Sequence, residues 1–303
     1  MQAFPPCPSV ADAPPALFER GHLWLHELVD SAPIRFRLAE DGRLRFADDH
    51  RTFGDDVPPA YGHVVRHVRE RFDRGALRDA VDDVTSVVFF GRAMHRRGVD
   101  YDWARTPSFL GSDVWSADAD RYLLPDRVEK IYRRLGLDPL ETVQAELRAA
   151  DFDPDAYAFP SSTWYDGPVA GVLVRNKTGL RAALSNPAVG GGSDTRRHDA
   201  ADARRGDEPD APESDTETAA RSLARRHATP ARFDAVAARL REENRPLTFD
   251  ALFERTVEIV VRAHHDRLFT GRDDVDLRAF RSAVAERTRA YLDDRGLDER
   301  DRS

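Results

Sequence analysis

The chain has 303 residues, of which 41% are hydrophobic and 33% charged, and its formal net charge is −8 at pH 7. This length and composition suffice for one large domain with a smaller one beside it. The sequence holds no run of roughly 18 consecutive apolar residues, so we expect no membrane-spanning helix and no membrane partner. The single cysteine, Cys7, excludes an internal disulfide and a thiolate metal cluster.

The first ten residues lack the basic start and the apolar run of a signal peptide, which predicts a cytoplasmic protein. Almost all cations are arginines, since lysine occurs only as Lys130 and Lys177. The overall acidity argues against general nucleic-acid binding, but it averages over the chain and leaves room for a local basic groove.

The N-terminal part of the chain alternates apolar and polar residues. Residues 1–16 are rich in proline and predict an extended arm. Residues 23–38 alternate with a break at 30–33, which predicts two antiparallel strands joined by a short turn. A third strand is expected after a hairpin turn at Asp41-Gly42.

Further elements follow from periodicity and turn residues. Helical spacing predicts helices over 60–81, 126–135 and 139–150, whereas β-branched and aromatic runs predict strands over 85–90 and 109–115. Another strand pair, 171–175 with 180–184, is expected around the turn 176–179.

The remainder of the chain changes character. Residues 186–229 contain almost no large apolar residue and predict a disordered linker. Beyond it, residues 233–240, 249–269 and 275–292 predict three amphipathic helices. The expected organisation is an arm (1–16), a strand-rich domain (17–185), a linker (186–229) and a helical C-terminal subdomain (230–303).

The sequence HELVD invites comparison with zinc proteases, which use His-Glu-x-x-His on a helix. Here position 30 is Asp30, and the stretch alternates like a strand, so no zinc site is expected. His95 and the adjacent pair His264-His265 are interpreted as surface or packed histidines, because adjacent residues of a helix point apart.

A different set of motifs fits the sequence better. The segments occur in the order and spacing of the nucleotidyltransferase motifs of ATP-dependent RNA ligases, and they read GHLWLHELVDSAPIRF, SVVFFGRAMHRRGVDYDW, SFLGSDVW, WYDGPVAGVLVRNK and LRAAL. Residues 18–185 therefore resemble the RNA ligase family, and in detail its archaeal branch. The resemblance implies an α+β fold, in which an antiparallel-sheet nucleotidyltransferase domain (ATP-grasp-like RNA ligase) covers 17–185 and a helical subdomain follows.

The resemblance also implies a reaction. In the family, a lysine attacks the α-phosphate of ATP, AMP passes to an RNA 5′-phosphate, and a 3′-hydroxyl displaces it. It follows that ATP and Mg²⁺ are the expected cofactors, that RNA and nucleotide are the expected partners, and that RNA repair is the expected process. Carboxylates on neighbouring strands would hold the metal.

At the positions that carry this chemistry the chain departs from the family. The replaced motif positions are Leu28, Ser31, Arg92, Ala170 and Ala183. Leucine has no nucleophile, so self-adenylation at position 28 is chemically impossible. Arginine in place of glutamate at position 92 reverses the local charge, which should repel Mg²⁺ and attract phosphate. No catalytic residue is intact, and we assign no metal ligand.

The surrounding residues are retained and predict a binding site. The positions assigned to cofactor binding are Glu27, Asp30, Arg51, Phe90, Gly91, Arg175 and Lys177. The arginines expected to line a groove are Arg35, Arg37, Arg51, Arg92, Arg96, Arg97, Arg175 and Arg181, each of which could equally be an exposed strand or loop residue. Aromatic residues that could stack on a base, or simply pack, are Trp24, Trp103, Trp164 and Tyr165.

Two hypotheses follow. The first is a pseudo-ligase that keeps the nucleotide- and RNA-binding scaffold and has lost self-adenylation. The alternative is an active or partly active ATP-dependent RNA ligase, which either uses Lys177 or seals ends that another enzyme has already adenylated. The oligomeric state is not predicted by the sequence.

Overall fold

The computed structural model describes residues 1–189, 213–269 and 275–296. These residues form two compact units. The sheet unit holds the described residues of Met1–Met94, Gly98–Tyr101 and Thr106–Ser193, and the helical unit holds those of His95–Arg97, Asp102–Arg105 and Asp194–Ser303. No helix in the described ranges has both the length and the apolar character to cross a bilayer.

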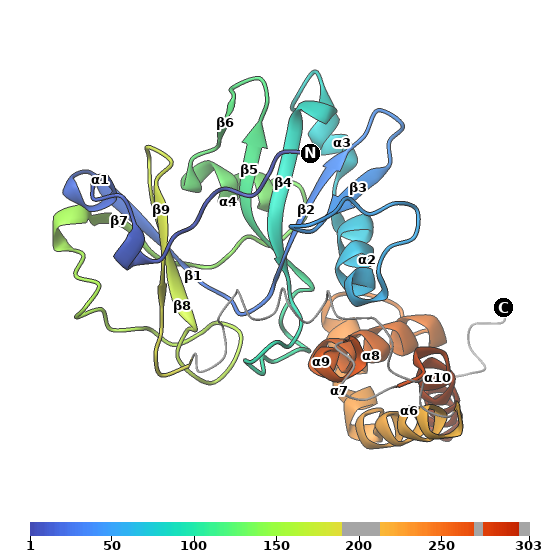
Figure 1. Ribbon diagram of the computed structural model, residues 1–303. Coiled ribbons are helices and arrows are strands. Elements are labelled where there is room, and N and C mark those ends of the chain that lie inside the picture. The colour runs from blue at the N-terminus through green and yellow to red at the C-terminus, as the bar shows by residue number, and fades with distance from the viewer. Residues whose placement is uncertain (190–212, 270–274, 297–303) are drawn as a thin grey trace. The chain divides into compact units, whose positions relative to one another are not determined.

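The sheet unit contains two antiparallel sheets (Figure 1). The four-stranded sheet has the order β7 (Thr142–Arg148), β1 (His22–Glu27), β8 (Gly171–Asn176), β9 (Arg181–Ser185). The five-stranded sheet has the order β3 (Leu44–Ala47), β2 (Ala32–Leu38), β4 (Val87–Ala93), β5 (Phe109–Ser116), β6 (Arg121–Tyr122). With helices at the C-terminal end, this confirms the predicted α+β fold class, and the β2–β3 and β8–β9 hairpins form as expected.

Each sheet buries one face in its own apolar core, because side chains of a strand alternate between faces. Leu23 and Leu25 of β1 lie in a core with Leu17 and Phe152. The other core contains Phe36 and many further apolar residues of the five-stranded sheet and its helices. The elements around these cores are η1 (Val10–Asp12), α1 (Ala16–Glu19), η2 (Pro59–Tyr61), α2 (Gly62–Arg71), α3 (Arg74–Arg78), η3 (Val84–Ser86), α4 (Pro125–Arg134) and η4 (Ala149–Asp151).

The prediction that residues 23–38 form one hairpin is wrong. β1 pairs with β7 and β8, whereas β2 pairs with β3 and β4, so the two strands belong to different sheets. Alternation identifies a strand, but the pairing partner depends on segments far along the chain. The chain passes from one sheet to the other between Leu28 and Ser31.

The predicted helix over 139–150 is also wrong, because this segment contains the edge strand β7. The N–H of Gly111 donates to the carbonyl of Asp138 at 2.8 Å, and the N–H of Leu140 donates to the carbonyl of Gly111 at 2.7 Å. These bonds draw the chain alongside β5 before it pairs with β1. Sheet pairing here overrides the helical propensity of Glu, Ala and Leu.

Two other helix predictions need correction. The expected helix over 60–81 is divided into η2, α2 and α3, because α2 ends before Phe72 and the Asp73 carboxylate caps α3 by accepting from the Ala76 N–H at 2.9 Å. The expected helix over 249–269 is divided at His264.

The described part of the helical unit contains two helices more than the three that the sequence predicts, because α6 is additional and the expected helix 249–269 is divided into two. Its helices are α6 (Glu213–His227), α7 (Pro230–Glu242), α8 (Phe249–Ala263), α9 (His265–Phe269) and α10 (Leu277–Asp294). The linker prediction for 186–229 is therefore wrong at α6, which buries Ala220, Leu223 and Ala224. Residues 190–212 lie outside the described residues.

Two histidines of the helical unit face each other. The Nδ1 of His227 and the Nε2 of His264 are 3.3 Å apart. Burial, together with the charges of His227 and Arg267, lowers the pKa of His264 from 6.5 to about 4. Burial and neighbouring arginines also lower the pKa of His227. The folded unit thus favours neutral imidazoles.

We expect the free energy of unfolding to decrease as the pH falls from about 6.5 towards about 4. In this window the unfolded chain binds more protons than the folded one, so stability rises with pH. His264 is partly exposed, so we expect the free energy of unfolding to change by about 1–2 kcal/mol, which is less than the full shift of its pKa would give. The free energy of unfolding in urea should depend less on pH in the His264→Gln variant than in the unmodified protein. The exposed His22→Gln is the control, and equal slopes for both variants would contradict the assignment.

Candidate functional site

The sides of the two sheets that do not contribute to the apolar cores face each other across a cleft. Leu23 and Leu25 belong to a core, so Trp24, His26 and Leu28 point to the opposite side of the sheet by strand alternation. Side chains from β5, β8 and β9 meet across this cleft, because Asp113 on β5 binds Arg175 on β8 and Arg181 on β9.

A buried ionic group joins the sheets. The Asp113 Oδ1 on β5 accepts from Arg175 Nη1 at 3.1 Å and from Arg181 Nη1 at 2.7 Å. All three side chains are less than a tenth exposed. Burial lowers the pKa of Arg175, and the Asp113 carboxylate opposes this effect. Two guanidinium groups share one carboxylate, so the group carries an excess positive charge.

Two polar nitrogens next to this group have no hydrogen-bond partner in the part of the chain that the structure describes. The Nε of Arg175 and the Nδ1 of His26 are shielded from solvent and make no hydrogen bond among the described residues. Burial and the charges of Arg175 and Arg181 hold the pKa of His26 well below 6.5, so the imidazole is neutral at physiological pH. The cleft therefore offers unused hydrogen-bonding capacity beside a net positive charge.

Leu28 occupies the predicted nucleophile position directly after β1. Its N–H donates to the carbonyl of Gly171 at 3.0 Å. A Cβ added to Gly171 would lie 3.1 Å from the Leu28 Cδ2 and 2.5 Å from the Leu184 carbonyl oxygen. The leucine side chain thus packs against the start of β8, where an attacking amine would be needed.

Glu27 and Asp30 lie on either side of Leu28 and bind neighbouring loops. The Glu27 carboxylate is buried, accepts from the Ser162 hydroxyl at 2.5 Å and from the Thr163 N–H at 3.3 Å, and has a pKa raised by burial. The Asp30 carboxylate accepts from the Val99 N–H at 3.0 Å. Both retained acids are therefore engaged in loop positioning.

Two of the replaced motif positions interact with each other. The Arg92 Nε donates to the Ser31 hydroxyl at 2.9 Å, and its Nη2 donates to the Ser31 carbonyl at 2.7 Å. The neighbouring Gly91 is required by packing, since a Cβ there would lie 2.4 Å from the Phe109 ring. The arginine at position 92 thus holds the crossover between the sheets.

Lys177 lies at the far end of the cleft from Leu28. Its Nζ is 4.8 Å from the centre of the Trp24 ring and 4.0 Å from the Glu146 Oε1. Trp24 precedes Leu28 by four residues of extended chain, so these two residues are roughly 13 Å apart at about 3.3 Å per residue, and the amine lies at the Trp24 end. The structure does not bring these two predicted site residues together.

Other predicted residues fall in several places. Arg51 is exposed and lies in the turn after β3, where its N–H donates to the Asp48 carboxylate at 2.7 Å. Ala170 has only a methyl side chain, and its backbone carbonyl accepts from the Asn186 N–H at 2.9 Å. Tyr165 lies near Tyr101, with ring centres 5.5 Å apart, and Trp164 shares its loop.

Part of the expected groove belongs to the helical unit. Arg96 and Arg97 are members of that unit, and the Arg96 N–H donates to the Arg262 carbonyl at 2.9 Å. Trp103 packs there under the Arg262 guanidinium at 5.3 Å. The groove arginines of the sheet unit are Arg35, Arg37, Arg51, Arg92, Arg175 and Arg181.

The N-terminal segment, residues 2–9, crosses the cleft, which the sequence did not predict. Figure 1 shows it passing from β4 and β5 to β9. Its Ala3 carbonyl accepts from the Tyr122 hydroxyl at 2.5 Å, and its Pro8 carbonyl accepts from the Ala183 N–H at 2.8 Å. Ala183 is a replaced motif position, so the segment pairs with the strand that bears it.

Ring contacts hold the same segment against the five-stranded sheet. The Phe4 ring is 5.1 Å from the Phe90 ring, edge to face, and the Arg35 guanidinium lies 5.1 Å from the Phe4 centre. Part of Cys7 faces solvent, yet the surrounding protein desolvates its thiol and raises its pKa, while Arg181 opposes this. The sequence analysis did not single out Phe4, although a lone aromatic residue in a Pro-rich arm is the one sequence feature that could have indicated this docking.

The side chains of the cleft do not suit a magnesium ion. Within the described ranges, no group of three or more His, Cys, Asp or Glu side chains could hold a metal. Arg92, Ala170 and Ala183 stand where the family resemblance expects two carboxylates and a lysine. Mg²⁺ prefers carboxylate oxygens, whereas guanidinium groups match phosphate.

Comparison with known proteins gives solved structures only, since no family model and no curated protein matches the sequence. The chain is similar to a mutant RNA ligase of Naegleria gruberi solved with ATP and Mn, with a TM-score of 0.49, 10% identity, and coverage of 62% of this chain and 57% of that one. It is also similar to an archaeal ATP-dependent RNA ligase, with a TM-score of 0.43, 15% identity, and coverage of 97% and 65%. Another form of the archaeal ligase is similar with a TM-score of 0.45 and 12% identity, and the match covers 97% of this chain and 66% of that one.

The chain thus spans less than two thirds of the length of each of these ligases. At these identities and TM-scores the similarity assigns neither a family nor an activity to this chain.

Substituting Asp113 by Asn should destabilise the sheet unit by about 3–5 kcal/mol, because two buried guanidinium groups lose their shared counter-charge. Urea unfolding measures the change, and the exposed Asp166→Asn is the matched control. Adding Arg181→Gln to Asp113→Asn should recover part of the loss, since one buried cation is then removed. A loss below about 1 kcal/mol for Asp113→Asn would show that the group is solvated and not buried.

Proposed function

We propose that this chain is a catalytically silent relative of ATP-dependent RNA ligases, which binds the phosphate of a nucleotide or RNA in the cleft and forms no lysyl-AMP. The observation that carries the proposal is the excess positive charge of the Asp113, Arg175 and Arg181 group. The Arg175 Nε, which has no hydrogen-bond partner among the residues that the structure describes, supplies a buried donor at the same place. Leu28 removes the nucleophile, but these groups keep the capacity to hold an anion.

Phosphate binding by this cleft needs no metal. A guanidinium group presents a rigid fork of N–H donors that matches phosphate geometry, and it stays charged throughout the physiological pH range. In a cleft partly shielded from water, each charge-assisted hydrogen bond is stronger than at the surface. The retained arginines therefore support binding, while the replaced residues remove the first chemical step.

The N-terminal segment supports the proposal that access to the cleft is controlled. Its carbonyls already accept from Tyr122 and Ala183, and its Phe4 ring covers Phe90. A ligand that enters between the sheets has to displace these contacts. Phe4, Pro5 and Pro8 are only partly buried, so we expect displacement of the segment to cost a few kcal/mol.

The alternative, an active ligase using Lys177, receives no support from a particular contact. The Lys177 amine is held over Trp24, roughly 13 Å along the strand from position 28. A misplacement of even about 1 Å is costly for an attacking group. Sealing of RNA ends that are already adenylated would not need this lysine. Formation of a joined RNA product distinguishes sealing from RNA binding alone.

Incubation of the protein with α-labelled ATP and Mg²⁺ should give no label that survives a denaturing gel. Label that disappears in Lys177→Ala would overturn the proposal.

A second variant restores the residues that the motifs call for and combines Leu28→Lys, Ser31→Gly, Arg92→Glu, Ala170→Glu and Ala183→Lys. We expect it to label more strongly when residues 2–8 are also deleted, because the segment crosses the restored site. The same assay with pre-adenylated RNA tests sealing, and a joined product would support partial activity.

Deletion of residues 2–8 should increase the affinity for a 5′-phosphorylated RNA oligonucleotide, measured by filter binding across a salt series. The Phe4→Ala variant should give a smaller increase, because it removes only the ring contact with Phe90. Arg181→Gln in the deletion background should weaken binding and reduce the salt slope by about 0.7, the value for one phosphate contact of a single strand. Absence of binding in every variant at low salt would leave the cleft without a phosphate ligand.

A further inference from the structure

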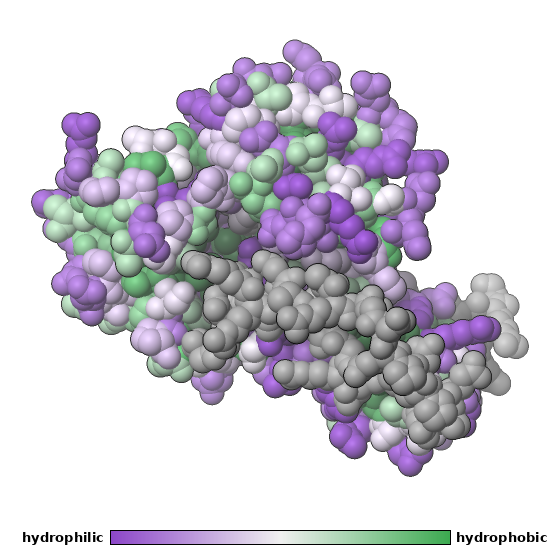
Figure 2. All heavy atoms as spheres, viewed as in Figure 1, coloured by the Kyte–Doolittle hydropathy of each residue, from purple (hydrophilic) through white to green (hydrophobic). Residues whose placement is uncertain are grey.

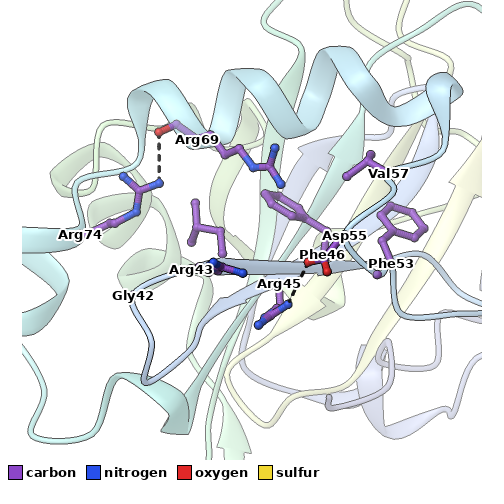
Figure 3. Close-up of a pocket in the computed structure, with 11 residues that line it drawn as sticks. Gly42, Arg43, Arg45, Phe46, Phe53, Asp55, Val57, Arg69 and Arg74 are labelled. Atoms are coloured by element: carbon purple, nitrogen blue, oxygen red, sulfur yellow. Dashed lines mark hydrogen bonds and ion pairs between the residues drawn. The ribbon is translucent and has the colours of Figure 1, made fainter.

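A second cavity lies away from the cleft, at the outer edge of the five-stranded sheet. It has a volume of about 360 Å³, against about 270 Å³ for the cavity at the Asp113 end of the cleft. It is formed by the edge strand β3, the loop that follows it, helix α2 and the start of α3 (Figure 3). In Figure 2, hydrophilic residues gather along this β3 edge of the sheet unit.

The charged lining of this cavity is dominated by arginine. The arginines are Arg43 and Arg45 on or beside β3, Arg69 on α2 and Arg74 at the start of α3, and the acid is Asp55. Arg45 is paired with Asp41 at 2.9 Å and lies 3.9 Å from Asp55. Within the described ranges, Arg43, Arg69 and Arg74 have no acidic partner within ion-pair distance, so the cavity holds an excess of positive charge.

The donors of these arginines are positioned by the fold. The Arg69 guanidinium lies over the Phe46 ring at 5.9 Å, and the Arg74 Nη2 donates to the Arg69 carbonyl at 3.4 Å, as drawn in Figure 3. The Nε of Arg74 is shielded from solvent and has no hydrogen-bond partner in the described part of the chain. A buried unpaired donor is unfavourable, and an anion in the cavity could satisfy it.

The floor of the cavity is apolar. Phe46 and Phe53 are less than a twentieth exposed, and the Leu44 and Val57 side chains complete the lining. A cavity of a few hundred Å³ with an apolar floor and a few convergent polar groups is typical of small-ligand sites. A free inorganic phosphate would leave this apolar surface without contact, whereas a base or ribose attached to the phosphate would cover it.

We propose that this cavity is a second site for a phosphate-bearing nucleotide. Arg43, Arg69 and Arg74 bind the phosphate, and the sugar or base lies against the apolar part of the lining, of which Val57 is partly exposed. The ligand is either a free nucleotide or one nucleotide of an RNA strand that runs past the β3 edge. The site is independent of the cleft, because none of its residues lies on β1, β5, β8 or β9.

The test uses the full chain and two probes, AMP and a 5′-phosphorylated RNA 12-mer, in calorimetric and anisotropy titrations. Arg43→Ala with Arg69→Ala removes two exposed cations from the cavity. The matched control, Arg127→Ala with Arg134→Ala, removes two exposed cations from α4 of the same unit. We expect the cavity variant to lose at least about tenfold in affinity and the control to lose less than about twofold, since charge-assisted hydrogen bonds are directional and the general field is screened.

Each outcome decides the proposal. A selective loss with AMP identifies a nucleotide site, and a selective loss with the 12-mer alone identifies a site for an RNA strand. Equal losses in the cavity and control variants, or no loss with either probe, overturn it. Loss of AMP binding in Arg181→Gln without an effect of the cavity variant assigns the ligand to the cleft and also overturns it. Equal urea midpoints of the two double variants verify that folding is unchanged.

Discussion

The sheet unit depends on one buried electrostatic contact, the carboxylate of Asp113 shared by Arg175 and Arg181. Charged groups are expensive to remove from water, and only close pairing with good hydrogen bonds offsets that cost. The contact therefore fixes how far apart the inner faces of the sheets lie at this end. Since two cations share one anion, it also leaves the cleft with positive charge, which is the basis for the proposed phosphate binding.

The replaced motif positions have new partners that are consistent with one another. Arg92 binds Ser31 through two hydrogen bonds, Leu28 packs against the strand at Gly171, and Ala183 donates its N–H to Pro8. Each of these three positions is therefore engaged by a neighbouring part of the sheet unit or by the N-terminal segment. The pairing of Arg92 with Ser31 in particular joins two substitutions in one interaction.

The strands of the sheet unit could be predicted because apolar and polar residues alternate with a period of two along the sequence. Leu23 and Leu25 alternate with Trp24 and His26, and the structure places the first pair in the core. Alternation does not identify the partner of each strand, so the sequence of 23–38 predicts one hairpin although β1 and β2 lie in different sheets. Residues 139–150 were assigned to a helix because pairing with β1, which makes β7 a strand, involves residues more than a hundred positions away. Helix α6 was missed because its apolar face is formed by small residues such as Ala220 and Ala224.

The sequence by itself determined that Leu28 stands where the motif resemblance expects a nucleophilic lysine, and a leucine side chain offers no nucleophile. Periodicity and turn residues are local properties of the chain, so they also located most strands and helices, and the motif resemblance implied the α+β class. Only the tertiary structure decided which side chains meet: that Asp113 binds Arg175 and Arg181, that Lys177 lies far from Leu28, and that residues 2–9 cross the cleft. These contacts join segments that are distant in the chain, and their formation depends on sheet pairing and burial, which no local pattern contains.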